Sequence, residues 1–156
     1  MVTDLIKTKY SSGNFNNCIV ARCQEGCKLK DIPNNYLILD GDKIEECNGR
    51  TESLPSCDCI ILKNIYHNKV LLIELRRGQI KLRKAKEKFK NSGEEIMNAI
   101  HEYGYNFPSL CPVLLGKIED SGLKSRDKEF WVNGKYCSIK VFQCGSSFND
   151  ITGFIN

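Results

Sequence analysis

Two acidic residues stand inside otherwise apolar segments in the middle of the chain. The stretch "CDCIILKNIYHNKVLLIELRRG" runs from Cys57 to Gly78 and contains two apolar runs separated by a polar turn. Asp58 lies near the start of the first run, and Glu74 lies near the end of the second. An unpaired carboxylate in a dry strand costs several kcal/mol, so we expect both acids to be solvated, hydrogen-bonded or bound to a cation.

The alternation of side chains along a strand predicts that the two acids meet. In extended strands Glu74 and Arg76 share one face, and Asp58 shares a face with Ile60. If the two runs pair as a hairpin through the turn "YHNK", Asp58 and Glu74 converge at one edge of the sheet. Two carboxylates and a nearby backbone carbonyl, which we assign to Leu75, form the oxygen-rich site that Mg²⁺ or Mn²⁺ prefers.

Such a metal site would suit the hydrolysis of phosphodiester bonds. A divalent cation lowers the pKa of a bound water and stabilises the charge that develops at phosphorus. The same residues also permit a purely structural interpretation, in which Asp58 begins a strand and Glu74 pairs with Arg76 or Arg77 at a strand end. The pattern of residues leaves both interpretations open.

Periodicity predicts the elements that would position these acids. Before Asn35 we expect loops with short extended pieces and little regular helix, because Gly, Pro and Asn recur there. Segments with the character of strands are expected at residues 36–39, 43–47, 57–65, 70–76 and 111–119. A further hairpin should turn at Asn133 and Gly134, with Trp131 and Phe142 in or beside the core.

One long amphipathic helix is predicted after the second acid. Apolar residues recur with helical spacing from Gln79 to about Tyr103, and the segment "NSGEE" could interrupt the helix, with Ser92 capping a second one. Strands, then one long helix, then strands predict an α+β domain with a mixed central β-sheet.

A run of basic residues lies on this predicted helix. Between Arg76 and Lys90 eight Lys and Arg residues stand against a single acid, Glu87. Such a run forms either a solvated face or a surface that faces phosphates. The net charge of +4 suits a polyanionic partner without requiring one.

Length and composition describe an ordinary globular domain. The chain has 156 residues, of which 41% are hydrophobic and 27% charged, and these fractions exclude disordered and membrane-embedded chains. No apolar run approaches the roughly 20 residues of a membrane span, and the N-terminus lacks the apolar region of a signal peptide. We therefore expect one cytoplasmic domain that does not associate with membranes.

Nine cysteines are many for a cytosolic protein of this size, and none forms a Cys-x-x-Cys pair. Buried free thiols are one interpretation, because Cys packs as a small hydrophobe. The spacing of Cys18, Cys23 and Cys27 is a weak signal for a metal site, with Cys47 as a fourth ligand. Intracellular disulfides are the third interpretation.

The order of these segments resembles the core of the PD-(D/E)xK nuclease superfamily. The sequence "CDCIIL" is followed by "VLLIELRRG", by the basic helix and by the strand "PVLLG", so that the resemblance covers about residues 35–117. It implies a restriction-endonuclease-like domain over residues 1–156 that cleaves DNA with Mg²⁺ or Mn²⁺. In this family pattern Asp58 and Glu74 bind the metal together with the Leu75 carbonyl, and a homodimer is expected if both strands are cut.

Arg76 departs from the family pattern, because it stands where the family has its lysine. Arginine stays charged and can only position groups or stabilise charge. Lys88 on the following helix is the candidate replacement, with Lys84 one turn earlier on the same face. Phosphate contacts are expected from basic residues on the helix and directly before it, namely Arg77, Lys81, Lys84 and Lys88.

The family also takes a further acid from an N-terminal helix, and the sequence indicates no helix there. Acids available for this role are Glu25, Asp42, Glu45 and Glu46. The incomplete set of catalytic groups favours a second hypothesis, a catalytically inactive nuclease fold that binds nucleic acid or protein. A third hypothesis is a metal-binding protein organised by its cysteines.

Overall fold

The structure is a computed structural model that describes residues 2–11, 18–47, 49, 54–63 and 69–153. Its helices are α1 (Val2–Ser11), α2 (Ile44–Cys47), α3 (Leu82–Glu102) and α4 (Phe148–Thr152), with a 3₁₀ turn at Ser125–Lys128. Its strands are β1 (Ile19–Val20), β2 (Tyr36–Asp40), β3 (Cys59–Lys63), β4 (Lys69–Ile80), β5 (Ser109–Ile118), β6 (Glu129–Val132), β7 (Lys135–Ser138) and β8 (Lys140–Phe142).

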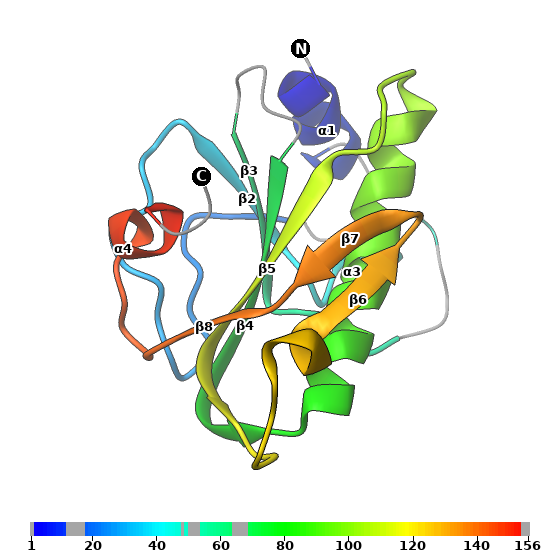
Figure 1. Cartoon of the computed structure of the whole chain (residues 1–156). Helices are drawn as coiled ribbons and strands as arrows, with labels where there is room; N and C mark the ends of the chain where they lie inside the picture. The colour runs from blue at the N-terminus through cyan, green and yellow to red at the C-terminus, as the bar shows by residue number, and fades with distance from the viewer. Residues whose placement is uncertain (1, 12–17, 48, 50–53, 64–68, 154–156) are drawn as a thin grey trace.

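Six strands form one mixed sheet in the order β1-β2-β3-β4-β5-β8. The neighbours from β1 to β4 pair antiparallel, whereas β5 pairs parallel with both β4 and β8. Helix α3 makes the crossover from β4 to β5 that a parallel pair requires (Figure 1). The predicted α+β class, the mixed sheet and the long helix after the central hairpin are confirmed, while the predicted turn "YHNK" lies largely outside the described residues.

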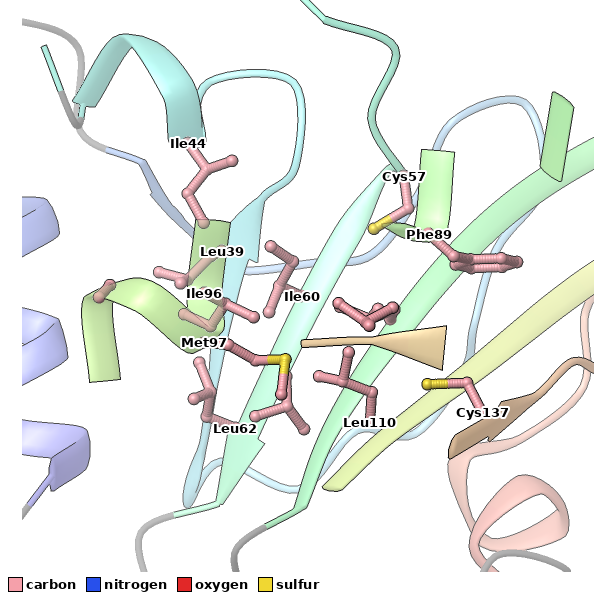
Figure 2. Packing of buried hydrophobic residues seen from close by; sticks show 14 of the residues in the cluster. Leu39, Ile44, Cys57, Ile60, Leu62, Phe89, Ile96, Met97, Leu110 and Cys137 are labelled. Atoms are coloured by element: carbon pink, nitrogen blue, oxygen red, sulfur yellow. The ribbon is translucent and has the colours of Figure 1, made fainter. Parts of the chain in front are cut away.

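Both faces of the sheet are buried, which explains why its central strands are apolar almost throughout. On one face Ile60 and Leu72 pack against α3 side chains that include Phe89 and Met97, and Figure 2 shows this core. The opposite face packs against the segment around Cys23 to Leu29 and against α4, on the far side of the sheet from α3 in Figure 1. The alternation predicted for the two central strands is confirmed.

Helix α3 runs without the interruption predicted at "NSGEE". Ser92 is buried, and its hydroxyl accepts the backbone N–H of Cys57 at 2.9 Å instead of capping a second helix. Gly93 faces β5, where a Cβ atom would lie 2.6 Å from a methyl carbon of Leu110. The two small residues therefore allow the helix to approach the sheet closely.

Two predictions for the N-terminal third are wrong. Residues 2–11 form helix α1, whose Ile6 and Tyr10 lie one turn apart and are buried in the core shared with α3. Residues 44–47 form helix α2 instead of a strand. After the turn at Asp40 and Gly41 the chain leaves the sheet, because β2 already has β1 and β3 as its two neighbours.

The hairpin predicted at Asn133 and Gly134 is confirmed. Both residues have positive φ, 48° and 77°, as a two-residue hairpin turn requires. Its strands β6 and β7 form a separate two-stranded sheet. Phe142 packs beside the core as predicted, whereas Trp131 is 64% exposed.

Among the described residues, no helix combines the length and the apolar character that crossing a bilayer would need.

Candidate active site

The two acids predicted to converge lie together at one end of the β3–β4 pair. Cys59 pairs with Ile73, so one further step along the same register brings Asp58 opposite Glu74. Asp58 occupies the bend before β3, and its Oδ2 accepts the backbone N–H of Leu75 at 2.7 Å. Glu74 points toward the α3 face of the sheet and is fully buried.

Two cations contact the same oxygen of Glu74. Lys88 reaches from α3 to place Nζ 2.7 Å from Glu74 Oε2, and Arg76 Nε lies 3.2 Å from that atom. The side chains of Lys88 and Arg76 remain 22% and 38% exposed, whereas that of Glu74 is 1% exposed. The ion pair of the structural interpretation is therefore present, and the predicted approach of Lys88 to the acids is also observed.

The other oxygen of Glu74 is unsatisfied. Within the described part of the chain, Oε1 is buried and has no hydrogen-bond donor while Asp58 is ionised, whereas a protonated Asp58 can donate to Glu74. An unsatisfied buried acceptor usually costs about 1–3 kcal/mol, so a retained one calls for an explanation such as an ion or water. A cation between the two carboxylates would satisfy this atom.

The backbone offers a third oxygen beside the carboxylates. The N–H and C=O of one residue leave an extended strand on the same side, so the Leu75 carbonyl points to the side of Asp58, which accepts the Leu75 N–H. The sequence predicts the same three oxygens as ligands of a metal, and this assignment stays a prediction. Among the described residues there is no group of three or more His, Cys, Asp or Glu side chains placed to hold a metal, so the side-chain part of the set is limited to two carboxylates.

The pKa of Asp58 is raised to about 7. Burial is the largest cause, followed by the negative charge of Glu74; the hydrogen bond that a protonated Asp58 donates to Glu74 raises the pKa further. The N–H of Leu75 and the charge of Lys88 oppose this shift. Asp58 is therefore partly protonated near neutral pH.

A divalent metal held by Asp58 should bind more tightly as the pH rises through about 7. A metal must displace the Asp58 proton, so the apparent affinity should fall up to about tenfold for each pH unit below 7. Because the folded-state pKa is raised, the contribution of Asp58 to the stability of the metal-free protein decreases as pH rises from about 4 to about 7. Calorimetric titration of Mn²⁺ between about pH 5.5 and about pH 8.5 measures the first effect. A dissociation constant that does not change with pH would exclude Asp58 as a ligand.

These residues line a cavity of about 420 Å³. Its lining consists of Glu25, Asp58, Glu74, Leu75, Arg76, Arg77, Gly78, Gln79 and Lys88. The structure thus brings together every predicted metal-binding and catalytic residue, and Arg77 with them. Lys81 and Lys84 do not line it; both are exposed on the first turn of α3 or just before it.

A bulge in β4 shapes one wall of this cavity. The register between β4 and β5 shifts between Leu75 and Gln79, so that three residues of β4 stand opposite Gly116 of β5. Gly116 has φ of 151°, and a Cβ atom there would lie 2.7 Å from the Arg76 carbonyl oxygen. The bulge turns Arg76 and Arg77 away from the regular ladder and toward the cavity.

The structure distinguishes among the acids that the sequence left undecided. Glu25 lines the cavity, although it comes from a loop and not from the N-terminal helix. The pKa of Asp42 is raised, mainly by burial and then by the negative charge of Asp40. The charges of Glu25 and Glu74 also raise it, so Asp42 lies near these two acids. Glu45 instead accepts the backbone N–H of Leu54, outside the cavity.

Six of the nine cysteines form disulfides, which pair Cys18 with Cys47, Cys23 with Cys59, and Cys27 with Cys144. This pairing contradicts the prediction that four of them ligate a metal, since a disulfide sulfur offers no thiolate. It also limits the prediction of free thiols to Cys57, Cys111 and Cys137.

Two of the disulfides flank the loop that carries Glu25. Cys23 is bonded to Cys59, the residue directly after Asp58, and Cys27 is bonded near the C-terminus. Arg77 Nε also donates to the carbonyl oxygen of Gly26 at 2.9 Å. These ties hold Glu25 beside the carboxyl pair, and no local sequence pattern indicates them.

The chain matches no model of a known protein family, no curated protein and no solved structure.

Proposed function

We propose that this protein is a divalent-metal-dependent nuclease that hydrolyses phosphodiester bonds of DNA. The observation that carries the proposal is the buried carboxylate of Glu74, which lies opposite Asp58 in a cationic cavity. Its Oε1 has no donor within the described residues while Asp58 is ionised. The order of elements also supports it: helix α1, four antiparallel strands with the short helix α2 among them, the long helix α3 and the parallel strand β5 accommodate the PD-(D/E)xK pattern that the sequence resembles.

Mg²⁺ or Mn²⁺ would be held by Asp58, Glu74 and the Leu75 carbonyl. Mg²⁺ usually keeps several water ligands and takes one or two protein carboxylates together with substrate phosphate, so a site with two carboxylates fits it. When bound, such an ion supplies a water of lowered pKa and a positive charge next to phosphorus.

The basic residues of the cavity would orient the phosphate and stabilise its developing charge. Lys88 and Arg76 lie within 3.2 Å of Glu74 Oε2 and remain partly exposed to the cavity. Arg77 is exposed on the bulge, and Lys81 and Lys84 extend the basic surface along α3. Contacts to phosphate from these side chains would make binding dependent on salt and largely independent of base sequence.

Replacing Lys88 with Met should separate its two expected effects. Lys88 competes with a metal for Glu74, so Lys88→Met should tighten Mn²⁺ binding by a few-fold. The same change should lower the cleavage rate about 10²-fold, because it removes a preorganised cation that stabilises the developing negative charge. Titration calorimetry and single-turnover cleavage on the same samples measure both. Lys90→Met, an exposed change on the same helix, serves as the control. A parallel loss of metal binding and cleavage would contradict this role.

A second candidate function is a nuclease fold that binds nucleic acid or protein without cleaving. It is favoured by the same ion pairs, because Lys88 and Arg76 already neutralise one oxygen of Glu74. Arg76→Lys tests the departure from the family pattern, and a gain in cleavage would indicate a workable site limited by the arginine.

The proposed function is tested by metal binding and cleavage measured together. The protein is titrated with Mg²⁺ and Mn²⁺ and then incubated with plasmid, single-stranded DNA and RNA, with EDTA as the control. Metal binding with EDTA-sensitive cleavage of DNA supports the nuclease. A folded protein that binds no metal and cleaves nothing supports the binding module. Light scattering on the same samples tests the proposed homodimer.

A further inference from the structure

A second cavity, of about 600 Å³, adjoins the candidate active site. The two cavities share Arg76, Arg77 and Gly78, so the β4 bulge forms the wall between them. The remaining lining residues are Gly116, Lys117, Val141, Phe142, Gln143, Cys144 and Ser146. None of these belongs to the metal-binding, catalytic or phosphate-contacting residues predicted from the sequence, although stacking on a base is a minor alternative there for Phe142. The nuclease chemistry proposed above uses none of them.

The lining combines charges with apolar surface. Arg77 and Lys117 provide cations, and Lys117 is exposed at the end of β5. Val141 and Phe142 of β8 provide apolar surface, and Gln143 adds an amide that can donate and accept hydrogen bonds. Cations for a phosphate, a ring for stacking and an amide for a base edge are the groups that a nucleotide requires.

The ring of Phe142 is held in place by the fold. Phe142 is partly buried and packs against the core on the sheet face opposite α3. In the parallel pairing of β8 with β5, Phe142 stands opposite Leu115. A ring held in this way can stack on a base with little loss of side-chain entropy.

The turn after β8 is also fixed before any ligand binds. The Cys27–Cys144 disulfide anchors it, and Ser146 Oγ donates to the Gln143 carbonyl oxygen at 2.7 Å. The backbone N–H of Lys30 donates to the Ser146 carbonyl oxygen at 3.1 Å. The cavity is therefore largely preformed, as ligand sites usually are.

We propose that this second cavity binds the nucleotide next to the phosphate held in the active-site cavity. Lys117 and Arg77 contact its phosphate, and Phe142 stacks on its base. A base within a duplex is stacked on its neighbours, so the preferred substrate carries an unpaired nucleotide beside the cleaved bond, as in single strands, overhangs or flaps. This inference rests on the proposed function and specifies its substrate.

Binding measured without catalysis tests the inference. In EDTA, fluorescence anisotropy follows a short labelled single strand and the matching duplex with wild type, Phe142→Leu, Phe142→Trp and Lys117→Met. We expect tighter binding of the single strand, about tenfold weaker binding by Phe142→Leu, and binding near wild type by Phe142→Trp. Lys117→Met should weaken binding and reduce the slope of log affinity against log salt concentration by about 1, as the loss of one phosphate contact does.

Two matched controls separate these effects from folding and net charge. Phe130→Leu alters a partly buried ring outside this cavity. Lys140→Met removes an exposed charge from β8, and Lys140 does not line the cavity. Neither should change the preference for single strands. The inference is overturned if Phe142→Leu, folded by its melting curve, binds as wild type does, or if duplex binds more tightly.

The same samples distinguish this inference from the proposed function. Cleavage that depends on Asp58 but not on Phe142 would support the nuclease and overturn the nucleotide site. Binding that depends on Phe142 and Lys117 in a protein that never cleaves would support the nucleotide site and overturn the nuclease.

Discussion

Asp58→Asn and Glu74→Gln are each expected to lower Mg²⁺-dependent cleavage by at least about 10³-fold, or about 4 kcal/mol of transition-state stabilisation. Each change replaces a negatively charged ligand with a neutral amide at the place where the two carboxylates meet. The rate of plasmid nicking at saturating Mg²⁺ measures the loss. Glu119→Gln, an exposed acid outside both cavities, is the control and should cleave as wild type does.

The stability of these variants separates a functional pair from a structural one. Asp58 and Glu74 repel each other, and this repulsion helps to raise the pKa of Asp58, so Asp58→Asn should melt no earlier than the metal-free wild type at pH 8. Glu74→Gln removes the partner of Lys88 and should melt slightly earlier. If Asp58→Asn instead melts far earlier and cleavage persists, Asp58 has a structural role.

Reduction of the disulfides is expected to cause the largest loss of stability. The three bonds close loops with sequence separations of 29, 36 and 117 residues. Loops of such lengths give roughly 3–5 kcal/mol per disulfide in the chain-entropy model, against about 5–15 kcal/mol for a whole domain. We therefore expect the melting temperature to fall by at least about 10 °C in a phosphine reductant, as measured by calorimetry.

A thiol titration provides the control for this prediction. In denaturant without reductant, only Cys57, Cys111 and Cys137 should react with a thiol reagent, and all nine cysteines should react after reduction. Nine reactive thiols before reduction would show that the bonds are not formed. A melting temperature unchanged by reduction would show instead that packing alone holds the segment around Glu25.

Reduction should also affect the site, because two disulfides flank the loop of Glu25. Cys59 directly follows Asp58, so its bond to Cys23 ties this loop to the end of β3. The buried Cys57 thiol lies on the other side of Asp58, and burial raises its pKa to about 12. Cys57 therefore stays protonated and is not expected to exchange with the disulfide at neutral pH.

Local sequence patterns are sufficient to predict the arrangement of the two central strands and the long helix. The period of two in the strands places Asp58 and Glu74 on the sheet face that α3 covers, and the helical period places Lys88 within reach of them. The Asn133–Gly134 turn was predicted because its backbone needs positive φ. These features depend on residues that are close in sequence, so local patterns reveal them.

Contacts between segments that are distant in sequence depend on the complete fold. The choice of Glu25, the β4 bulge at Arg76, the pairing of Cys27 with Cys144 and the cavity beside Phe142 join segments up to 117 residues apart. Helix α1 was missed for the same reason, since its short apolar stripe gains stability from packing against the core shared with α3. The unsatisfied oxygen of Glu74 and the raised pKa of Asp58 likewise arise from burial, which depends on the whole fold and not on the local sequence.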